Sequence, residues 1–135
     1  MKVSDILRIK GHTLFTTTPQ QPLMDAVRAM SDQDIGSLVV LHQGQLAGML
    51  TFREVLRGLN AQHGNLGDLP VSAVMVHDPL VCAPEDASES VRDRMTQQHV
   101  RYVPVVEGGR LLGVISFTAN AVGSSMIKVV AIAPK

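Results

Sequence analysis

Two short segments of this chain combine residue types that could contact a phosphorylated ligand. They are residues 48–54 and residues 113–119, which lie 65 positions apart. In each segment a glycine and an apolar run lead to a hydroxyl side chain, Thr51 or Ser116, after which we expect a helix to begin. Backbone N–H groups at a helix start attract anions, and a hydroxyl there can donate to a phosphate oxygen. Both segments are therefore candidate anion-binding sites.

Glu54 adds an acidic group three residues after Thr51. Its carboxylate could accept hydrogen bonds from both hydroxyls of a ribose. The same spacing is also that of a capping box, in which the two side chains satisfy backbone donors of their own helix. Both interpretations can hold for Thr51. The second segment has Ala119 at the corresponding position, so we expect at most one strong nucleoside site, the one that holds Glu54.

The two segments belong to an internal repeat. Residues 17–52 align with residues 82–117 without a gap, and residues 3–7 align with residues 71–75 at an offset of 68. The longer block contains the identical pairs Pro19/Pro84, Met30/Met95, Gln33/Gln98, Val40/Val105, Gly44/Gly109, Leu46/Leu111, Gly48/Gly113 and Phe52/Phe117. The predicted divisions are a first repeat (residues 1–62), a linker (63–70), a second repeat (71–122) and a C-terminal tail (123–135).

Each copy has the pattern of strand, helix, strand, strand and helix. Apolar residues at helical spacing predict the first helix, namely Leu23, Ala26, Val27 and Met30. At the start of its counterpart, Asp86 and Glu89 have the spacing of a capping box. Two apolar runs around a Gly-containing turn then predict a β-hairpin in each copy, over residues 37–51 and 100–116.

The fold class that we predict is α/β (α+β), with two β-α-β-β-α repeats. A three-stranded sheet with two helices on one face leaves its other face open, so we expect the repeats to pack sheet to sheet with pseudo-two-fold symmetry. The end of the second copy differs, because residues after Phe117 lack the pattern of a closing helix and residues 127–132 read as a β-segment. An extra edge strand, a partner-binding tail and an addition foreign to the natural chain all remain open.

This organisation resembles a known family, the tandem pair of cystathionine-β-synthase (CBS) domains, or Bateman module. The resemblance covers about residues 3–122 and depends on the order of motifs that are individually unspecific. These motifs are residues 5–7, the helix from Pro19 to Met30, residues 102–106, and the segments 48–51 and 113–116.

The resemblance implies that an adenosine ligand binds in an apolar crevice between the two copies. It implies ribose contact at Glu54 and phosphate contacts at Thr51 and Ser116. Further candidate phosphate partners, or else ordinary solvated side chains, are Arg53, Arg101 and Arg110. The complete set of predicted nucleotide-binding residues is Thr17, Gly36, Ser37, Leu38, Thr51, Arg53, Glu54, Arg101, Tyr102, Val103, Pro104 and Ser116. The chain departs from the family pattern in having Glu54 for the usual Asp and Ala119 where an acid is expected.

The implied function is a regulatory module that senses AMP, ADP, ATP or S-adenosylmethionine, requires no cofactor and signals to an unidentified partner protein. The family commonly pairs into homodimers through helix faces, and here Val55, Leu56 and Leu59 would supply part of such a face. The alternative is an interaction or scaffold protein that kept the fold and lost the ligand.

Composition and motifs argue against other classes of protein. Lys plus Arg and Asp plus Glu are 12 each, and aromatic residues are few, so we expect no nucleic-acid binding. No apolar run approaches the roughly 20 residues that cross a bilayer, so we expect no membrane contact and a cytoplasmic location. The histidines lack zinc spacing, Cys82 falls in an apolar strand, and no catalytic motif is present. We therefore expect neither a metal site nor enzyme activity.

Overall fold

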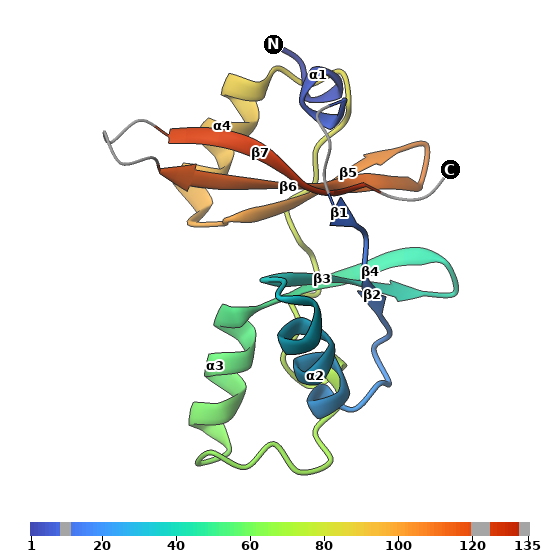
Figure 1. Ribbon diagram of the computed structural model, residues 1–135, viewed down its shortest axis with the longest axis vertical. Coiled ribbons are helices and arrows are strands. Elements are labelled where there is room, and N and C mark those ends of the chain that lie inside the picture. Colours follow the sequence, from blue (N-terminus) through green and yellow to red (C-terminus); the bar gives the residue numbers. More distant parts are fainter. Residues whose placement is uncertain (9–11, 120–124, 133–135) are drawn as a thin grey trace. The chain divides into compact units, whose positions relative to one another are not determined.

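The computed structural model describes residues 1–8, 12–119 and 125–132 (Figure 1). The chain forms two compact units. The middle unit is Phe15–Pro79, and the terminal unit joins Met1–Leu14 to Leu80–Lys135. Both contain helices and strands, which confirms the predicted mixed fold class.

The middle unit is built on a three-stranded sheet in the order β2-β3-β4. The strands are β2 (Thr16–Thr17), β3 (Ser37–His42) and β4 (Gln45–Thr51), and they pair parallel and then antiparallel. The predicted hairpin is present, and its turn needs Gly44, where φ is +78°, because side chains rarely adopt that region.

Two helices cover one side of this sheet, α2 (Leu23–Gln33) and α3 (Phe52–Ala61) (Figure 1). The predicted stripe of α2 is confirmed, because Leu23, Ala26 and Met30 are buried in one cluster with residues of both long strands. A short 3-10 helix, η1 (Val71–Ala73), completes the core with Val71.

The terminal unit contains a four-stranded sheet in the order β1-β7-β6-β5. The strands are β1 (His12–Thr13), β5 (Tyr102–Glu107), β6 (Arg110–Ala119) and β7 (Ser125–Ile132). The helices are α1 (Val3–Leu7) and α4 (Ser88–Gln98). The core cluster is Val3, Ile6, Cys82, Val91, Met95, Val103, Val105 and Ile115.

The compact units do not coincide with the two sequence repeats, because the opening segments are exchanged. Val3 and Ser4 donate backbone hydrogen bonds to the carbonyls of Asp86 (2.9 Å) and Pro84 (2.8 Å) in the terminal unit. The matching bonds in the middle unit join Val71 to Gln21 and Ser72 to Pro19, each at 2.9 Å. Each core is thus completed by the opening segment that the sequence places in the other copy. The repeat boundaries themselves stay a prediction.

The expected helix after Ser116 is not present, and that prediction was wrong. Strand β6 continues through Ala119 and pairs antiparallel with β7, with Ser116 opposite Lys128 and Phe117 opposite Ile127. The physical reason is the available partner: the apolar, partly β-branched run 114–118 favours a strand once β7 pairs with it, and no acid stands at residue 119 to cap a helix. The structure therefore supports the interpretation of this segment as an extra strand. It is not an edge strand along its whole length, because β1 pairs with β7 at Ala131 and Ile132.

The predicted capping box of the second helix was also wrong. The N-cap residue of α4 is Ala87, which makes no side-chain cap. Asp86 instead accepts a hydrogen bond from the Ala83 backbone N–H (2.9 Å) and pairs with Arg94 (3.2 Å) through the same oxygen, Oδ2. The Asp86 carboxylate thus binds the Ala83 N–H and the Arg94 guanidinium and does not cap the helix.

Candidate functional site

The candidate site in the middle unit lies at the end of the sheet opposite the hairpin turn. Ser37 begins β3 and Thr51 ends β4, and the two residues are direct cross-strand partners. Thr51 is also the N-cap of α3, which places Glu54 in the first helical turn. Three of the predicted residues are therefore brought to one strand end by the hairpin register and the helix that follows it.

Thr51 and Glu54 form the capping pair that their spacing predicted. Oε1 of Glu54 accepts from the backbone N–H of Thr51 (2.8 Å) and from its hydroxyl (2.7 Å). The hydroxyl oxygen in turn accepts from the Arg53 backbone N–H at 3.3 Å. The capping interpretation is confirmed, and both donors end on one carboxylate oxygen, so Oε2 takes no part in the pair.

Four of the predicted site residues are buried polar or charged side chains. Among the described residues, the buried polar or charged side chains are Thr17, Ser37, Glu54 and Ser116, and all of them belong to the predicted nucleotide-binding set. Glu54 is only 4% exposed. A buried carboxylate is costly unless hydrogen bonds stabilise it, and the Thr51 cap supplies two.

The terminal unit repeats the strand-end geometry but not the helix. Tyr102 is the cross-strand partner of Ser116, as Ser37 is of Thr51, and Val103 and Pro104 follow in the same register. Beyond Ser116 the backbone belongs to the ladder between β6 and β7. No helix start therefore follows Ser116 within the described part of this unit, and the proposed phosphate contact there stays a prediction.

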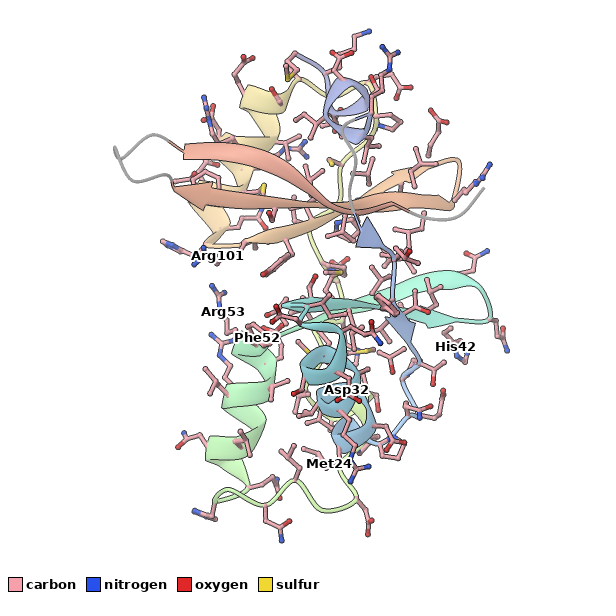
Figure 2. All side chains as sticks on the ribbon, viewed as in Figure 1. Met24, Asp32, His42, Phe52, Arg53 and Arg101 are labelled. Carbon is pink, nitrogen blue, oxygen red and sulfur yellow. The ribbon has the colours of Figure 1, made fainter. Side chains whose placement is uncertain are left out.

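The three arginines that are candidate phosphate partners are exposed. Arg53 and Arg101 are exposed (Figure 2), and the Arg101 carbonyl accepts from the Phe117 N–H at 2.9 Å. Arg110 is likewise exposed, in the second hairpin. Phosphate contact at these positions stays a prediction.

A pocket of about 290 Å³ lies in the middle unit between α2 and the β2 side of the sheet. Two predicted site residues, Thr17 and Leu38, contribute to its wall. The full lining is Thr16, Thr17, Thr18, Gln21, Asp25, Ala26, Ala29 and Leu38.

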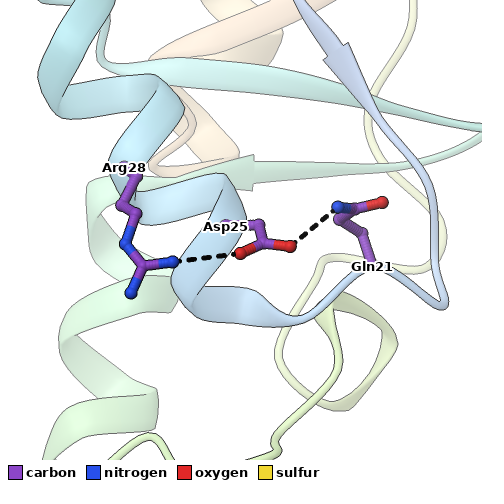
Figure 3. Close-up of polar contacts among 3 residues, drawn as sticks. All are labelled: Gln21, Asp25 and Arg28. Atoms are coloured by element: carbon purple, nitrogen blue, oxygen red, sulfur yellow. Dashed lines mark hydrogen bonds and ion pairs between the residues drawn. The ribbon is translucent and has the colours of Figure 1, made fainter.

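Sequence reasoning included Thr17 but missed the charged and amide side chains of this pocket, Asp25 and Gln21. Asp25 accepts from Gln21 Nε2 through Oδ2 (2.9 Å) and pairs with Arg28 Nη1 through Oδ1 (3.2 Å) (Figure 3). The signal that could have found the pocket is Ala29, because the repeat has Arg94 at the matching position of the second copy.

Cys82 has none of the features of a reactive thiol. It is buried in the terminal-unit core beside β5, where its N–H donates to the Pro104 carbonyl at 3.1 Å. Burial, together with the nearby charge of Asp86, raises the pKa of the thiol to about 12. The thiolate that would act as a nucleophile or a metal ligand is thus disfavoured.

Within the described ranges, no group of three or more His, Cys, Asp or Glu side chains is placed to hold a metal ion. No helix in the same ranges is both long and apolar enough to cross a membrane.

Comparison with known proteins identifies the family. The CBS domain matches residues 3–61 and residues 71–119, so the chain belongs to the CBS domain family and carries the domain twice. The CBS domain-containing protein YhcV of Bacillus subtilis is 33% identical over 107 residues, which cover 79% of this chain and 76% of YhcV.

Solved structures agree on the fold. A CBS-domain containing protein from Agrobacterium tumefaciens has a TM-score of 0.79 at 30% identity, covering 86% of this chain and 93% of its own. The CBS domain pair of protein MJ0100, in complex with 5′-methylthioadenosine and S-adenosyl-L-methionine, has a TM-score of 0.73 at 20% identity, covering 86% and 92%. The predicted resemblance is confirmed, and proteins built from paired CBS domains are regulatory ligand-binding modules.

Proposed function

We propose that this chain is a regulatory module that binds an adenine nucleotide or an S-adenosyl compound and signals the bound state to a partner protein. The observation that carries the proposal is the buried carboxylate of Glu54, joined to Thr51 at the start of α3. A buried acid at a helix start, with two hydroxyl side chains at the same strand end, offers groups for both a ribose and a phosphate.

The chemistry follows from what each group donates or accepts. A ribose diol donates, so it would take the place of the Thr51 hydroxyl on the Glu54 carboxylate. The released hydroxyl could then donate to a phosphate oxygen, near the positive end of the α3 dipole. Capping in the free state and ligand contact in the bound state would therefore use the same pair of side chains.

The ligand class is supported by the MJ0100 domain pair, which was solved with 5′-methylthioadenosine and S-adenosyl-L-methionine. We extend this to AMP, ADP, ATP and S-adenosylmethionine as the compounds to test. Differential binding to two arrangements of the protein would shift their populations, and a partner protein would sense that shift.

A homodimer is part of the proposal, with a changed contact surface. Val55 and Leu59 pack against the middle-unit core, so they offer less surface than the sequence pattern implied. Leu56 (65% exposed) and Phe52 (57% exposed), one helical turn apart, instead form the outward apolar pair of α3. We assign the dimer contact to this pair.

The testing experiment is a thermal-shift and calorimetric titration with AMP, ADP, ATP, S-adenosylmethionine and a guanine nucleotide as control. We expect adenine compounds to raise the melting temperature by several degrees at about a hundredfold excess over Kd. Glu54→Ala should lower the free energy of unfolding by about 1 kcal/mol and abolish that response.

A matched control separates capping from binding. Asp5 accepts from the Lys2 backbone N–H at 2.9 Å at the start of α1 and is far in sequence from the candidate site. Asp5→Ala should remove a comparable cap and leave the nucleotide response unchanged. Equal responses in the Glu54→Ala variant and the unmodified chain would contradict the proposed ribose contact.

The scaffold alternative is favoured by a specific observation, the replacement of the second closing helix by the strand pair of β6 and β7. Within the described part of the second repeat, Ser116 is followed by neither a helix start nor an acid, the two features on which the proposal for Thr51 and Glu54 depends. A flat response to every adenine compound, from a folded sample, would support this alternative.

A further inference from the structure

The two units of the protein contain the same helix–sheet groove, which holds an arginine side chain in one and is open in the other. Helix α2 and helix α4 correspond residue for residue at the repeat offset of 65, as do β3 and β5. The parallel pairing of Thr17 with Val40 has its counterpart in the bridge between Cys82 and Val105. The pocket in the middle unit can therefore be compared directly with its equivalent in the terminal unit.

In the terminal unit an arginine occupies this place. Arg94 stands where the middle unit has Ala29, and Asp86 stands where it has Gln21. The Nη2 of Arg94 lies 3.2 Å from Oδ2 of Asp86, and Nε of Arg94 is shielded from solvent. The Arg94 side chain thus reaches from the position of Ala29 to the carboxylate at the position of Gln21, with its Nε buried and 37% of the side chain exposed.

The middle unit has Ala29 and no arginine at the place of Arg94, but an acid is present. Ala29 leaves a pocket of about 290 Å³, which corresponds to the volume of about ten water molecules. Asp25 supplies the carboxylate, one helical turn from Ala29, and Gln21 and the hydroxyls of residues 16–18 supply further acceptors. No positively charged side chain belongs to the pocket wall.

We propose that this pocket binds a small molecule that carries a guanidinium or a primary ammonium group on a short apolar stem. Ala26, Ala29 and Leu38 would contact the stem, as apolar surface does in small-ligand pockets. The charged head would donate to the Asp25 carboxylate, which has capacity for more donors than Gln21 and Arg28 now supply. The site is thus a cation site, distinct in chemistry from the anion-accepting groups at Thr51.

The bond between Asp25 and Arg28 does not prevent this. The Arg28 side chain is 68% exposed, and an exposed ion pair of this kind contributes little free energy. A ligand held by the pocket walls would therefore compete successfully for the carboxylate. Removing Arg28 should strengthen binding rather than weaken it.

The test uses n-butylguanidinium and its neutral, equally shaped analogue n-butylurea as probes of the full chain. Backbone amide NMR shifts would be followed at about 10 mM probe or less, far below the molar concentrations at which guanidinium denatures proteins. We expect saturable shifts at residues 16–18, 21 and 25–29 with the guanidinium. Butylurea should bind about tenfold more weakly or worse, because it lacks the charge-assisted bonds.

Matched variants decide the role of the carboxylate. Asp25→Asn should reduce guanidinium binding to the level of butylurea, whereas Asp32→Asn, the same change at an exposed position of α2 (Figure 2), should leave it unchanged. Ala29→Arg should fill the pocket from within and abolish binding. Should Ala29→Arg fail to fold, Asp25→Asn remains decisive. Equal affinity for the two probes, no saturation, or equal binding by the two Asn variants would each overturn the proposal.

The outcome is separable from the nucleotide proposal. Glu54→Gln should leave butylguanidinium binding intact while it removes the response to adenine compounds. Because Thr17 and Leu38 also belong to the predicted adenine-lining set, an AMP titration that displaces butylguanidinium from the unmodified chain would show one shared site and overturn the independence of this one.

Discussion

At the scale of single residues, Glu54 caps helix α3 and is also the residue to which we assign the ribose contact. Two donors of Thr51, its backbone N–H and its hydroxyl, stabilise the buried carboxylate of Glu54, and a ribose could replace or share them. The spacing in the sequence predicted this pair, because a capping box depends only on local geometry. The pocket at Asp25 could not be predicted in the same way, since it arises from the small size of Ala29 opposite a sheet.

Cys82 provides a residue-scale prediction about reactivity. Its pKa of about 12, raised mainly by burial from an ordinary value of 9.0, leaves the thiolate at pH 8 about a thousandfold less populated than in an unfolded chain. Iodoacetamide should therefore label the native protein at least a thousandfold more slowly than the denatured protein. Labelling is measured by mass spectrometry, and rapid modification of the folded chain would show that the thiol is accessible and ionised.

The same pKa shift sets a pH dependence of stability. Because the folded-state pKa lies above the unfolded value, the unfolded chain loses this proton first as the pH rises. The contribution of Cys82 is therefore full below about pH 9 and is lost progressively between about pH 9 and 12. Urea titrations of the protein and of Cys82→Ser at pH 8 and pH 10.5 should show a steeper loss of stability in the cysteine form.

Gly48 is required by the close approach of another backbone segment. A Cβ atom there would lie 2.4 Å from the Val76 carbonyl oxygen, which accepts from the Met49 N–H at 3.1 Å. We expect Gly48→Ala to lower the free energy of unfolding by about 1–3 kcal/mol, through the displaced backbone. Gly44→Asn is the control: its φ of +78° disfavours most side chains, but Asn tolerates this region and the space around the turn is open, so the change should cost less. Chemical denaturation compares the two variants, and equal stabilities would contradict the argument.

At the scale of elements, prediction was most successful where the pattern was strictly local. The apolar stripe of α2 and the hairpin of β3 and β4 follow from residue spacing, and both are present. For the second copy, the prediction of a helix after Ser116 was wrong because pairing with the distant strand β7 decides the secondary structure of this segment. The predicted Asp86 cap was wrong because the Ala83 N–H, in the preceding turn, and Arg94, eight residues further on, both bind this carboxylate.

Helix α3 provides the element-scale prediction about assembly. Its outward pair, Phe52 and Leu56, is the surface that we assign to a homodimer. Leu56→Glu should shift the protein toward monomer in analytical ultracentrifugation at micromolar concentration, because it introduces a charge into an apolar contact. Arg57→Gln, at an exposed position of the same helix, lowers the net charge by the same one unit and is the control that should leave the assembly unchanged. A monomeric unmodified chain would contradict the assignment.

At the scale of the whole molecule, the exchange of opening segments decides which parts of the chain can fold alone. Val71 is fully buried in the middle-unit core, together with Leu66 and Met75, and these residues lie beyond the predicted first repeat. A sequence alignment locates repeats but does not show which copy completes which core. That information depends on contacts between residues that are distant in the chain.

Two fragments of similar length test this exchange. Residues 15–79 contain the complete middle unit, whereas residues 1–62 contain the predicted first repeat and lack η1. We expect the first fragment to give dispersed NMR spectra and cooperative thermal unfolding, and the second to remain largely unfolded. Equal stability of the two fragments would show that the opening segments are not needed for the cores.

The reciprocal bonds of Val3 with Asp86 and of Val71 with Gln21 also have a kinetic consequence. A single copy of the repeat, made as a separate chain, would need an opening segment from a second chain, and its folding would depend on protein concentration. Joining both copies in one polypeptide turns that encounter into an intramolecular one, at an effective concentration on the order of millimolar for a short connection. Tandem duplication thus makes completion of each core independent of how much protein the cell contains.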